Sequence, residues 1–173
     1  MINTADHHQQ LLSAQYVQSG LLPKKRHFDR LFSDSFALYL PKSMVSGDFF
    51  WVGQKHNMRY LVVGDCTGHG ISASLTSVLA LNLFEYIIMN KGLKRTSQIL
   101  AEMDKRYIDC FKDSHSESFD NPWIDLAIIA IDNEEEKIYF SSANRKLLCV
   151  KQNGESKSYS SSGYPIGGWQ IQN

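Results

Sequence analysis

The stretch LVVGDCTGHGISAS, residues 61–74, constrains the fold more than any other part of the sequence. The continuous apolar run Tyr60–Val63 is typical of a strand that is buried on both faces. It leads through a glycine-rich turn into residues 72–89, which are apolar almost all round and long enough for a buried helix. A buried strand that turns directly into a buried helix predicts a layered domain with this turn at one end of a sheet.

Hydrophobic patterns elsewhere predict the elements around this strand. Helices are expected from Thr4 to about Gly20, packed by one apolar stripe, and from about Thr96 to Phe111. The basic segment 24–32 is expected to be a solvated connector. Further strands are expected at Phe36–Leu40, Phe49–Val52, Ile124–Ile131, Lys137–Phe140 and Leu147–Val150. This order of helices and strands is typical of an α+β fold rather than of regular βαβ units.

Composition and charge exclude several classes of protein. The chain has 173 residues, which suits one domain. Its 18 basic and 18 acidic residues give a net charge of 0, so no overall field attracts nucleic acid or anionic lipid. Three scattered cysteines indicate neither a disulfide framework nor a zinc site, which favours a reducing cytoplasm. A polar N-terminal segment and the lack of a long apolar run predict neither secretion nor membrane insertion.

The glycine-rich turn carries the first candidate for chemistry, Asp65. A carboxylate at a strand end, on a loop bent by glycines, can hold a hard divalent cation through oxygen ligands. The backbone carbonyl of Cys66 is a further oxygen donor in the same turn. The glycines expected to shape this region are Gly47, Gly64, Gly68 and Gly70. The alternative is that Asp65 only caps the turn or the helix that follows.

A second carboxylate, Asp48, follows Gly47 and precedes the aromatic run FFWV. Asp48 therefore also lies at a strand entrance, although it is equally compatible with a β-bulge turn. Two aspartates on adjacent strands can share a metal pair that clamps a phosphate and lowers the pKa of a bound water. The pair Asp48 and Asp65 is therefore the candidate catalytic centre.

Six phrases now identify a resemblance. AQYVQSGLLP, LYLPKSMVSGDFFWV, VGDCTGHGISASL, WIDLAIIAID, FSSANRKLLCV and GYPIGG occur in this order between Ala14 and Gly168. In that order and spacing they resemble the SpoIIE-type (RsbU-like) branch of the PP2C, or PPM, metal-dependent protein serine/threonine phosphatases. The resemblance implies an αββα sandwich of two antiparallel sheets between helix layers, with a two-metal site that binds Mn²⁺ or Mg²⁺. It also implies hydrolysis of phosphoserine or phosphothreonine on a protein, such as an anti-sigma-factor antagonist.

The resemblance assigns roles to individual residues. Asp48 and Asp65 match metal-ligand aspartates, and the carbonyl of Cys66 matches a backbone ligand. His69 is a candidate proton donor to the leaving serine oxygen, although it does not align with the DGH histidine of the wider superfamily, and shaping of the loop is the alternative. Asp125 lies inside an apolar strand, so it is expected either beside the site or as a satisfied hydrogen-bond acceptor.

One departure from the family affects the expected activity. The family continues after GYPIG with a DG phrase whose aspartate binds metal, whereas this sequence stops at Asn173. The resemblance therefore implies a C-terminally incomplete sandwich that holds two metals, one or none, with exposed strand edges that favour a homodimer. The expected organisation is an N-terminal helix or linker over 1–22, continuing from an upstream sensory or regulatory domain, and a phosphatase domain over 23–173. The alternative function is a noncatalytic phosphoprotein-binding or dimerisation module.

Overall fold

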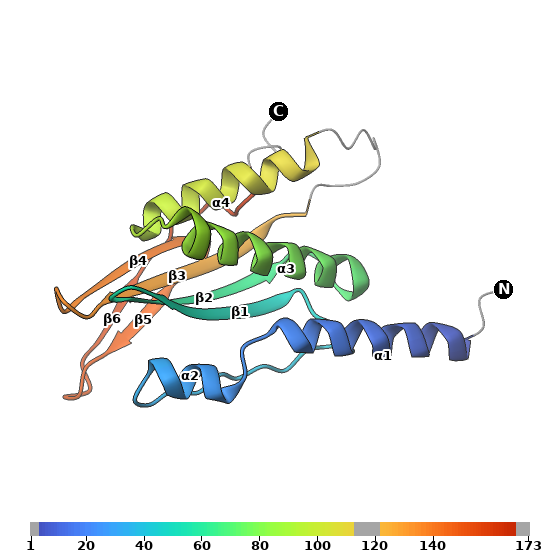
Figure 1. Cartoon of the computed structure of the whole chain (residues 1–173), viewed down its shortest axis with the longest axis horizontal. Coiled ribbons are helices and arrows are strands. Elements are labelled where there is room, and N and C mark those ends of the chain that lie inside the picture. Colours follow the sequence, from blue (N-terminus) through green and yellow to red (C-terminus); the bar gives the residue numbers. More distant parts are fainter. Residues whose placement is uncertain (1–3, 113–121, 169–173) are drawn as a thin grey trace.

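The computed structural model describes residues 4–112 and 122–168. Its helices are α1 (Thr4–Leu21), α2 (Lys25–Leu31), α3 (Gly70–Glu85) and α4 (Thr96–Phe111), with a π-helical segment η1 (Tyr86–Lys91) after α3. Its strands are β1 (Asp48–Lys55), β2 (Met58–Cys66), β3 (Ile124–Asp132), β4 (Lys137–Ala143), β5 (Leu147–Val150) and β6 (Ser156–Tyr159). Figure 1 shows α3 and α4 above the main sheet and α2 below it. This layered arrangement confirms the expected α+β class.

The main sheet is antiparallel, with the strand order β1-β2-β3-β4. Along β2 and β3, buried residues mostly alternate with more exposed ones, because successive side chains point to opposite faces of a sheet. In the pairing of β2 with β3, Met58 lies opposite Asp132 at one end and Cys66 opposite Ile124 at the other. The expected strands 49–52, 60–63, 124–131 and 137–140 all fall within this sheet.

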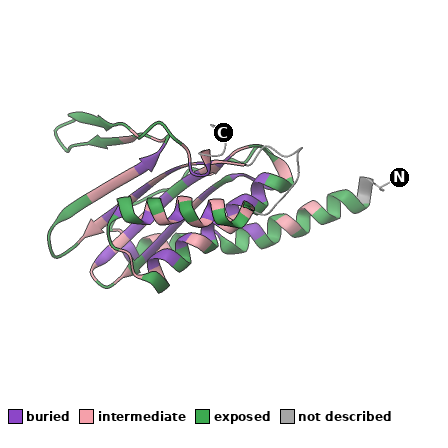
Figure 2. Ribbon diagram, turned by 90° about the horizontal axis from the view of Figure 1, so that it is seen from above, coloured by how far each residue is buried: buried purple, intermediate pink, exposed green. Residues whose placement is uncertain are grey.

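The hydrophobic core lies between the sheet and the helices α3 and α4. Phe49 of β1 points to this side, where its ring centroid is 6.4 Å from that of Phe84 in α3. From α4, Ile99 and Met103 are completely buried. Figure 2 shows the buried residues concentrated on the strands and on the helix faces that meet them. Burial of these apolar side chains drives the packing of the helices on the sheet.

The opposite face of the sheet, called here the outer face, is covered at β1 by α2. Phe50 points to this side and lies 5.8 Å from the ring of Phe28 in α2. The solvated connector expected at 24–32 is therefore wrong, because Lys25–Leu31 is helical and buries Leu31. The expected strand Phe36–Leu40 is also wrong, since this segment joins no strand ladder and its alternating apolar side chains have no cross-strand partners.

A small two-stranded sheet is formed by β5 and β6. The sequence predicts β5 but not β6, whose polar composition, SKSY, carries no strand signal. The residues of β5 and β6 are largely exposed. The ring of Tyr159 in β6 lies 6.5 Å from the ring of Phe140 on β4. Figure 2 shows this hairpin projecting from the main body of the domain.

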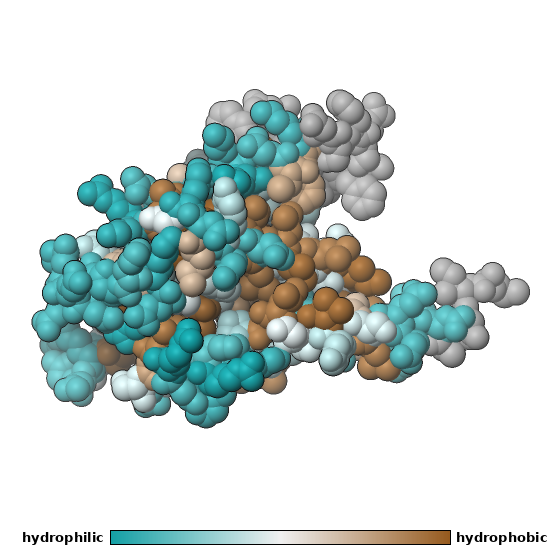
Figure 3. All heavy atoms as spheres, viewed as in Figure 1, coloured by the Kyte–Doolittle hydropathy of each residue, from teal (hydrophilic) through white to brown (hydrophobic). Residues whose placement is uncertain are grey.

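The predicted N-terminal helix is present as α1, but its predicted packing is wrong. Leu12, Tyr16 and Val17 are exposed, Tyr16 by 81% of its surface. Among residues 6–21, the buried side chain is that of Gln18. Figure 3 shows apolar atoms gathered where α1 lies near the start of α3.

The segment Gly70–Lys91 has the length and apolar composition of a membrane-spanning helix. Half of the tested window is buried inside the domain, where α3 packs on the sheet. Packing against the core accounts for this composition, because a buried helix is apolar on several sides.

Candidate active site

Three aspartates form a row across one end of the main sheet. Asp48 of β1 lies opposite Asp65 of β2, and Asp65 lies opposite Asp125 of β3. Residues directly opposite each other on antiparallel strands share a face, with Cα atoms about 4.5–5.5 Å apart. The neighbours Phe49 and Cys66 are buried toward the helices, so the three carboxylates belong to the outer face. We call these three residues the aspartate row.

Gly47 allows the loop before β1 to lie against the end of β2. The Cys66 N–H donates a hydrogen bond of 3.1 Å to the Gly47 carbonyl. A Cβ atom at residue 47 would lie 2.6 Å from the carbonyl oxygen of Cys66. Only glycine therefore leaves room for this approach, which brings the Asp48 loop beside the backbone carbonyl predicted as a metal ligand.

The other predicted loop glycines fall into two groups. Gly68 lies in the turn between β2 and α3 and Gly70 is the first residue of α3; their φ angles of +96° and +74° strain residues with a side chain. Gly64 is not in a loop: it lies within β2, where a Cβ atom would meet the ring of Phe49. The loop-shaping role predicted for Gly64 is therefore replaced by one in strand packing.

A cation that sequence reasoning missed, Arg145, lies at the aspartate row. Its guanidinium donates a hydrogen bond to Oδ2 of Asp65 and is 4.0 Å from Oδ2 of Asp125. The preceding residue, Asn144, has a φ of +58° and donates from Nδ2 to Oδ2 of Asp125 at 3.0 Å. Both residues lie in the phrase FSSANRKLLCV, but nothing in the local sequence shows that Arg145 reaches a strand 80 residues earlier.

Among the described residues, only one of the two carboxylate oxygens of Asp125 has a hydrogen-bond partner. Asn144 satisfies Oδ2, whereas Oδ1 is buried and has no hydrogen-bond partner among the described residues. A buried carboxylate oxygen without a donor is costly unless it is protonated or binds a cation. The structure therefore places Asp125 beside Asp65 with one buried oxygen that no described residue satisfies.

The electrostatics of the row follow from burial and like charge. Partial burial, followed by repulsion from Asp65, raises the pKa of Asp48, and the nearby Arg145 partly opposes this rise. Burial also raises the pKa of the Cys66 thiol, which keeps it neutral. Cys66 therefore contributes a carbonyl to this region and does not act as a thiolate nucleophile.

Asp48 and Asp65 of the row line a pocket of about 270 Å³. Asp48, Asp65 and Arg145 supply its charged groups, and the other lining residues are Leu38, Tyr39, Leu40, Phe49, Phe50, Val63 and Gly64. His69 lies at the N-cap of α3, exposed, and makes no side-chain hydrogen bond to the helix end. The structure thus brings Asp48, Asp65 and Asp125 together and records no contact between His69 and these carboxylates.

The donor set suits a hard divalent cation. Asp48, Asp65 and the backbone carbonyl of Cys66 are oxygen donors, which Mg²⁺ and Mn²⁺ prefer. Within residues 4–112 and 122–168, no group of three or more histidine, cysteine, aspartate or glutamate side chains is close enough to hold a metal ion. The side chains described here would therefore hold a cation with few protein ligands, and water would complete its coordination.

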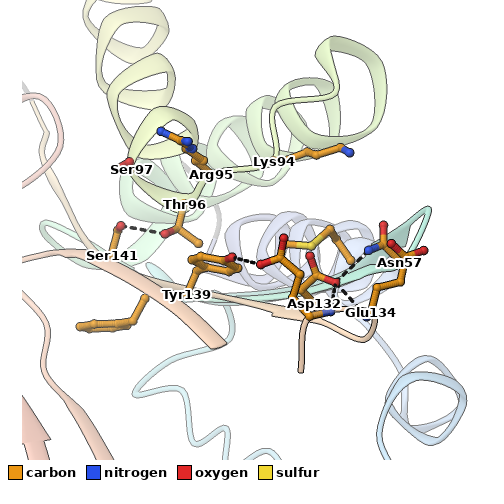
Figure 4. Close-up of a pocket in the computed structure, with 12 residues that line it drawn as sticks. Asn57, Lys94, Arg95, Thr96, Ser97, Asp132, Glu134, Tyr139 and Ser141 are labelled. Atoms are coloured by element: carbon orange, nitrogen blue, oxygen red, sulfur yellow. Dashed lines mark hydrogen bonds between the residues drawn. The ribbon is translucent and has the colours of Figure 1, made fainter. Parts of the chain in front are cut away.

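A larger pocket, of about 640 Å³, lies at the other end of the sheet (Figure 4). There Asp132 accepts a hydrogen bond of 2.8 Å from Asn57, and Thr96 is 2.8 Å from Ser141. Hydrogen bonds from the backbone of the β3–β4 turn lower the pKa of Asp132. These contacts stabilise the turn and the start of α4, so the aspartate row remains the better candidate for chemistry.

The family model for stage II sporulation protein E (SpoIIE) matches residues 56–170, which is most of the chain. The chain belongs to the SpoIIE family. This result confirms the resemblance to the SpoIIE-type branch of PP2C phosphatases. Comparison with curated proteins gives no match.

Solved structures show the same fold. The SiaA PP2C domain of Pseudomonas aeruginosa superposes with a TM-score of 0.82 at 22% identity, over 95% of this chain and 64% of that chain. RsbX in complex with magnesium superposes with a TM-score of 0.54 at 17% identity, over 72% of this chain and 55% of that chain. The PP2C domain of Bacillus subtilis SpoIIE, solved with a fragment of its regulatory domain, superposes with a TM-score of 0.53 at 18% identity, over 71% of this chain and 34% of that chain. This SpoIIE-family chain thus spans less than two thirds of the length of each of these structures.

Proposed function

We propose that this SpoIIE-family chain is a metal-dependent protein serine/threonine phosphatase domain with its active centre at the aspartate row. The observation that carries the proposal is the register that sets Asp48 opposite Asp65, beside the Gly47–Cys66 contact. Two carboxylates and a backbone carbonyl at one sheet end form a site of hard oxygen ligands. Membership of the family and the PP2C fold support the same reaction class.

In this proposal each residue has a stated task. Asp48, Asp65 and the Cys66 carbonyl hold Mn²⁺ or Mg²⁺, and Asp125 supports Asp65 from the next strand. A cation bound there lowers the pKa of water toward neutrality and supplies charge that stabilises a phosphoryl transition state. His69, on the exposed loop before α3, is the proposed donor of a proton to the leaving serine oxygen. Asp48 and Asp65 bind the cation as carboxylates.

The proposed substrate is a phosphorylated signalling protein, such as an anti-sigma-factor antagonist, in the cytoplasm. RsbX was solved with magnesium, and SpoIIE was solved with part of a regulatory domain, which supports a divalent metal and an adjoining regulatory domain here. We propose that residues 1–22 form the helix leading from such a domain and that 23–173 form the phosphatase domain. A homodimer through exposed edges is part of the same proposal.

One observation favours a second function. The guanidinium of Arg145 already pairs with Asp65 and lies near Asp125. Arginine also binds phosphate groups well. A module that binds a phosphorylated protein through Arg145 without hydrolysing it is therefore the alternative.

The test is Mn²⁺-dependent release of phosphate from a phosphoserine protein by the purified chain. We expect Asp65→Asn to abolish the metal-dependent rate. Asp34→Asn is the matched control, because Asp34 is an exposed aspartate outside the row. No release by the parent chain, together with phosphoprotein binding that survives Asp65→Asn, would favour the binding module instead.

A further inference from the structure

We infer that Gln18 of α1 is a positioning residue that holds the loop carrying Asp48. The inference rests on the proposed function, in which Asp48 is a metal ligand. Gln18 is only 5% exposed, on a helix whose apolar residues Tyr16 and Val17 face solvent. A buried polar side chain on an otherwise exposed helix indicates a specific hydrogen-bonding task.

The task is visible in the contacts of its amide group. Gln18 Nε2 donates hydrogen bonds to the carbonyl of Ser46 at 2.6 Å and to Oγ of Ser77 at 2.8 Å. Gln18 Oε1 accepts the N–H of Ser46 at 3.1 Å. The side chain therefore satisfies both backbone groups of Ser46, as a neighbouring strand would do.

From Ser46 the contacts continue to the aspartate row. Oγ of Ser46 accepts the N–H of Asp48 at 3.1 Å, and the intervening Gly47 accepts the N–H of Cys66. Ser46 and Gly47 precede β1, so no strand ladder fixes Ser46. Gln18 supplies that restraint from α1, and Ser77 anchors Gln18 to α3. The position of Asp48 relative to Asp65 thus depends on how α1 is docked.

This arrangement gives α1 a function beyond packing. Figure 1 shows α1 extending away from the sheet toward the N-terminus, with its later turns near the start of β1. A displacement of α1 that breaks the bonds from Gln18 removes the partner of the Ser46 N–H and leaves the Ser46 carbonyl with only the longer bond of 3.4 Å from Ser77 Oγ. The loop then loses its fixed geometry, and the Asp48 carboxylate loses its alignment with Asp65. Groups that orient a metal ligand typically change metal affinity by about 10–100-fold when mutated.

The experiment compares the parent chain with Gln18→Ala, Gln18→Met and Gln15→Ala. Gln18→Met keeps the volume and the helix propensity while removing the amide. Gln15→Ala is the matched control, since Gln15 is an exposed glutamine on the same helix. Three quantities are measured. They are the Kd for Mn²⁺, from the electron paramagnetic resonance signal of free Mn²⁺, the rate of hydrogen exchange at the Ser46 amide, and the temperature of thermal unfolding.

We expect both Gln18 variants to weaken Mn²⁺ binding by about tenfold or more and to speed exchange at Ser46, while Gln15→Ala matches the parent chain. Folded Gln18 variants with the parental Kd overturn the inference, even if they unfold at a lower temperature, because a merely structural role predicts that result. Absence of Mn²⁺ binding by the parent chain refutes the proposed function itself. Unchanged hydrogen exchange at the Ser46 amide overturns the inference that Gln18 holds this loop, whether or not the chain binds Mn²⁺.

Discussion

Replacement of Asp48 by asparagine should stabilise the metal-free domain while removing a ligand from the site. Asp48 faces Asp65 directly across the β1–β2 ladder, and burial and this repulsion together raise its pKa. Like charges placed directly opposite on a sheet destabilise it by about 0.2–1 kcal/mol. Asparagine keeps the shape of the side chain and removes the charge. The expected gain in the free energy of unfolding at neutral pH is therefore about 0.2–1 kcal/mol, reduced by the lost attraction to Arg145.

The sign of the pH dependence follows from the direction of the pKa shift. A carboxyl whose folded pKa is raised above its unfolded value of about 3.9 lowers stability once the pH exceeds the folded pKa. Below the unfolded value both states are protonated, and the effect vanishes. The advantage of Asp48→Asn should thus be complete at pH 7 and disappear as the pH falls toward the unfolded pKa.

Thermal unfolding in the presence of EDTA measures the effect. For a chain of this length, 1 kcal/mol corresponds to about 2–4 °C in Tm, so the gain of about 0.2–1 kcal/mol predicts a rise of about 0.4–4 °C at pH 7. Added Mn²⁺ should raise the Tm of the parent chain more than that of Asp48→Asn. Asp34→Asn, at an exposed position outside the row, should change neither value. A lower Tm for Asp48→Asn than for the parent chain in EDTA would refute the reasoning, because Asp48 would then be a net stabilising residue.

Substitutions at three further positions test the row and the core beside it. Gly47→Ala should cost about 1–3 kcal/mol in urea unfolding, because its Cβ would lie 2.6 Å from the carbonyl of Cys66; a neutral result would contradict the close approach. Phe84→Ala should cost about 3–5 kcal/mol by the same measurement, since Phe84 is completely buried, and a loss below 1 kcal/mol would contradict its place in the core. Asn144→Ala should lower the Tm more than Asn144→Gly does, because glycine tolerates the φ of +58°. Both Asn144 variants should lower Mn²⁺ affinity if the bond to Asp125 orients that carboxylate, whereas unchanged affinity would separate Asn144 from the site.

Local sequence patterns were sufficient for the strands that carry the row. The apolar run 60–63 and the aromatic run 49–52 predicted β2 and β1, and the glycines beside Asp48 and Asp65 placed both carboxylates at strand ends. Their opposition is a matter of register, which follows once the hydrophobic residues of both strands face the same core. The family phrases then supplied the chemistry that spacing alone left open.

Long-range contacts explain what the sequence could not predict. Arg145 reaches Asp65 across 80 residues, and Gln18 reaches Ser46 across 28. The sequence around each of these two residues does not distinguish it from a polar residue that is exposed to solvent. Helix α2 was missed because its seven residues are mostly polar and it is stabilised by packing, through Phe28 on Phe50. The segment 36–40 shows the opposite error. Its apolar residues alternate as in a strand, but it pairs with no strand in the described part of the chain and therefore forms none.

The aspartate row is itself an argument for a bound cation. The like charges of Asp48 and Asp65 lie opposite each other, and one buried oxygen of Asp125 has no donor among the described residues; both features oppose folding, and Arg145 offsets only part of the charge. A stable sheet end needs no such row, and local conflicts of this kind concentrate at functional sites. A ligand present at 100 times its Kd contributes about 2.7 kcal/mol to the folded state. That exceeds the repulsion of about 1 kcal/mol expected from one opposed pair, so a divalent cation of ordinary affinity would outweigh the repulsion at this end of the sheet.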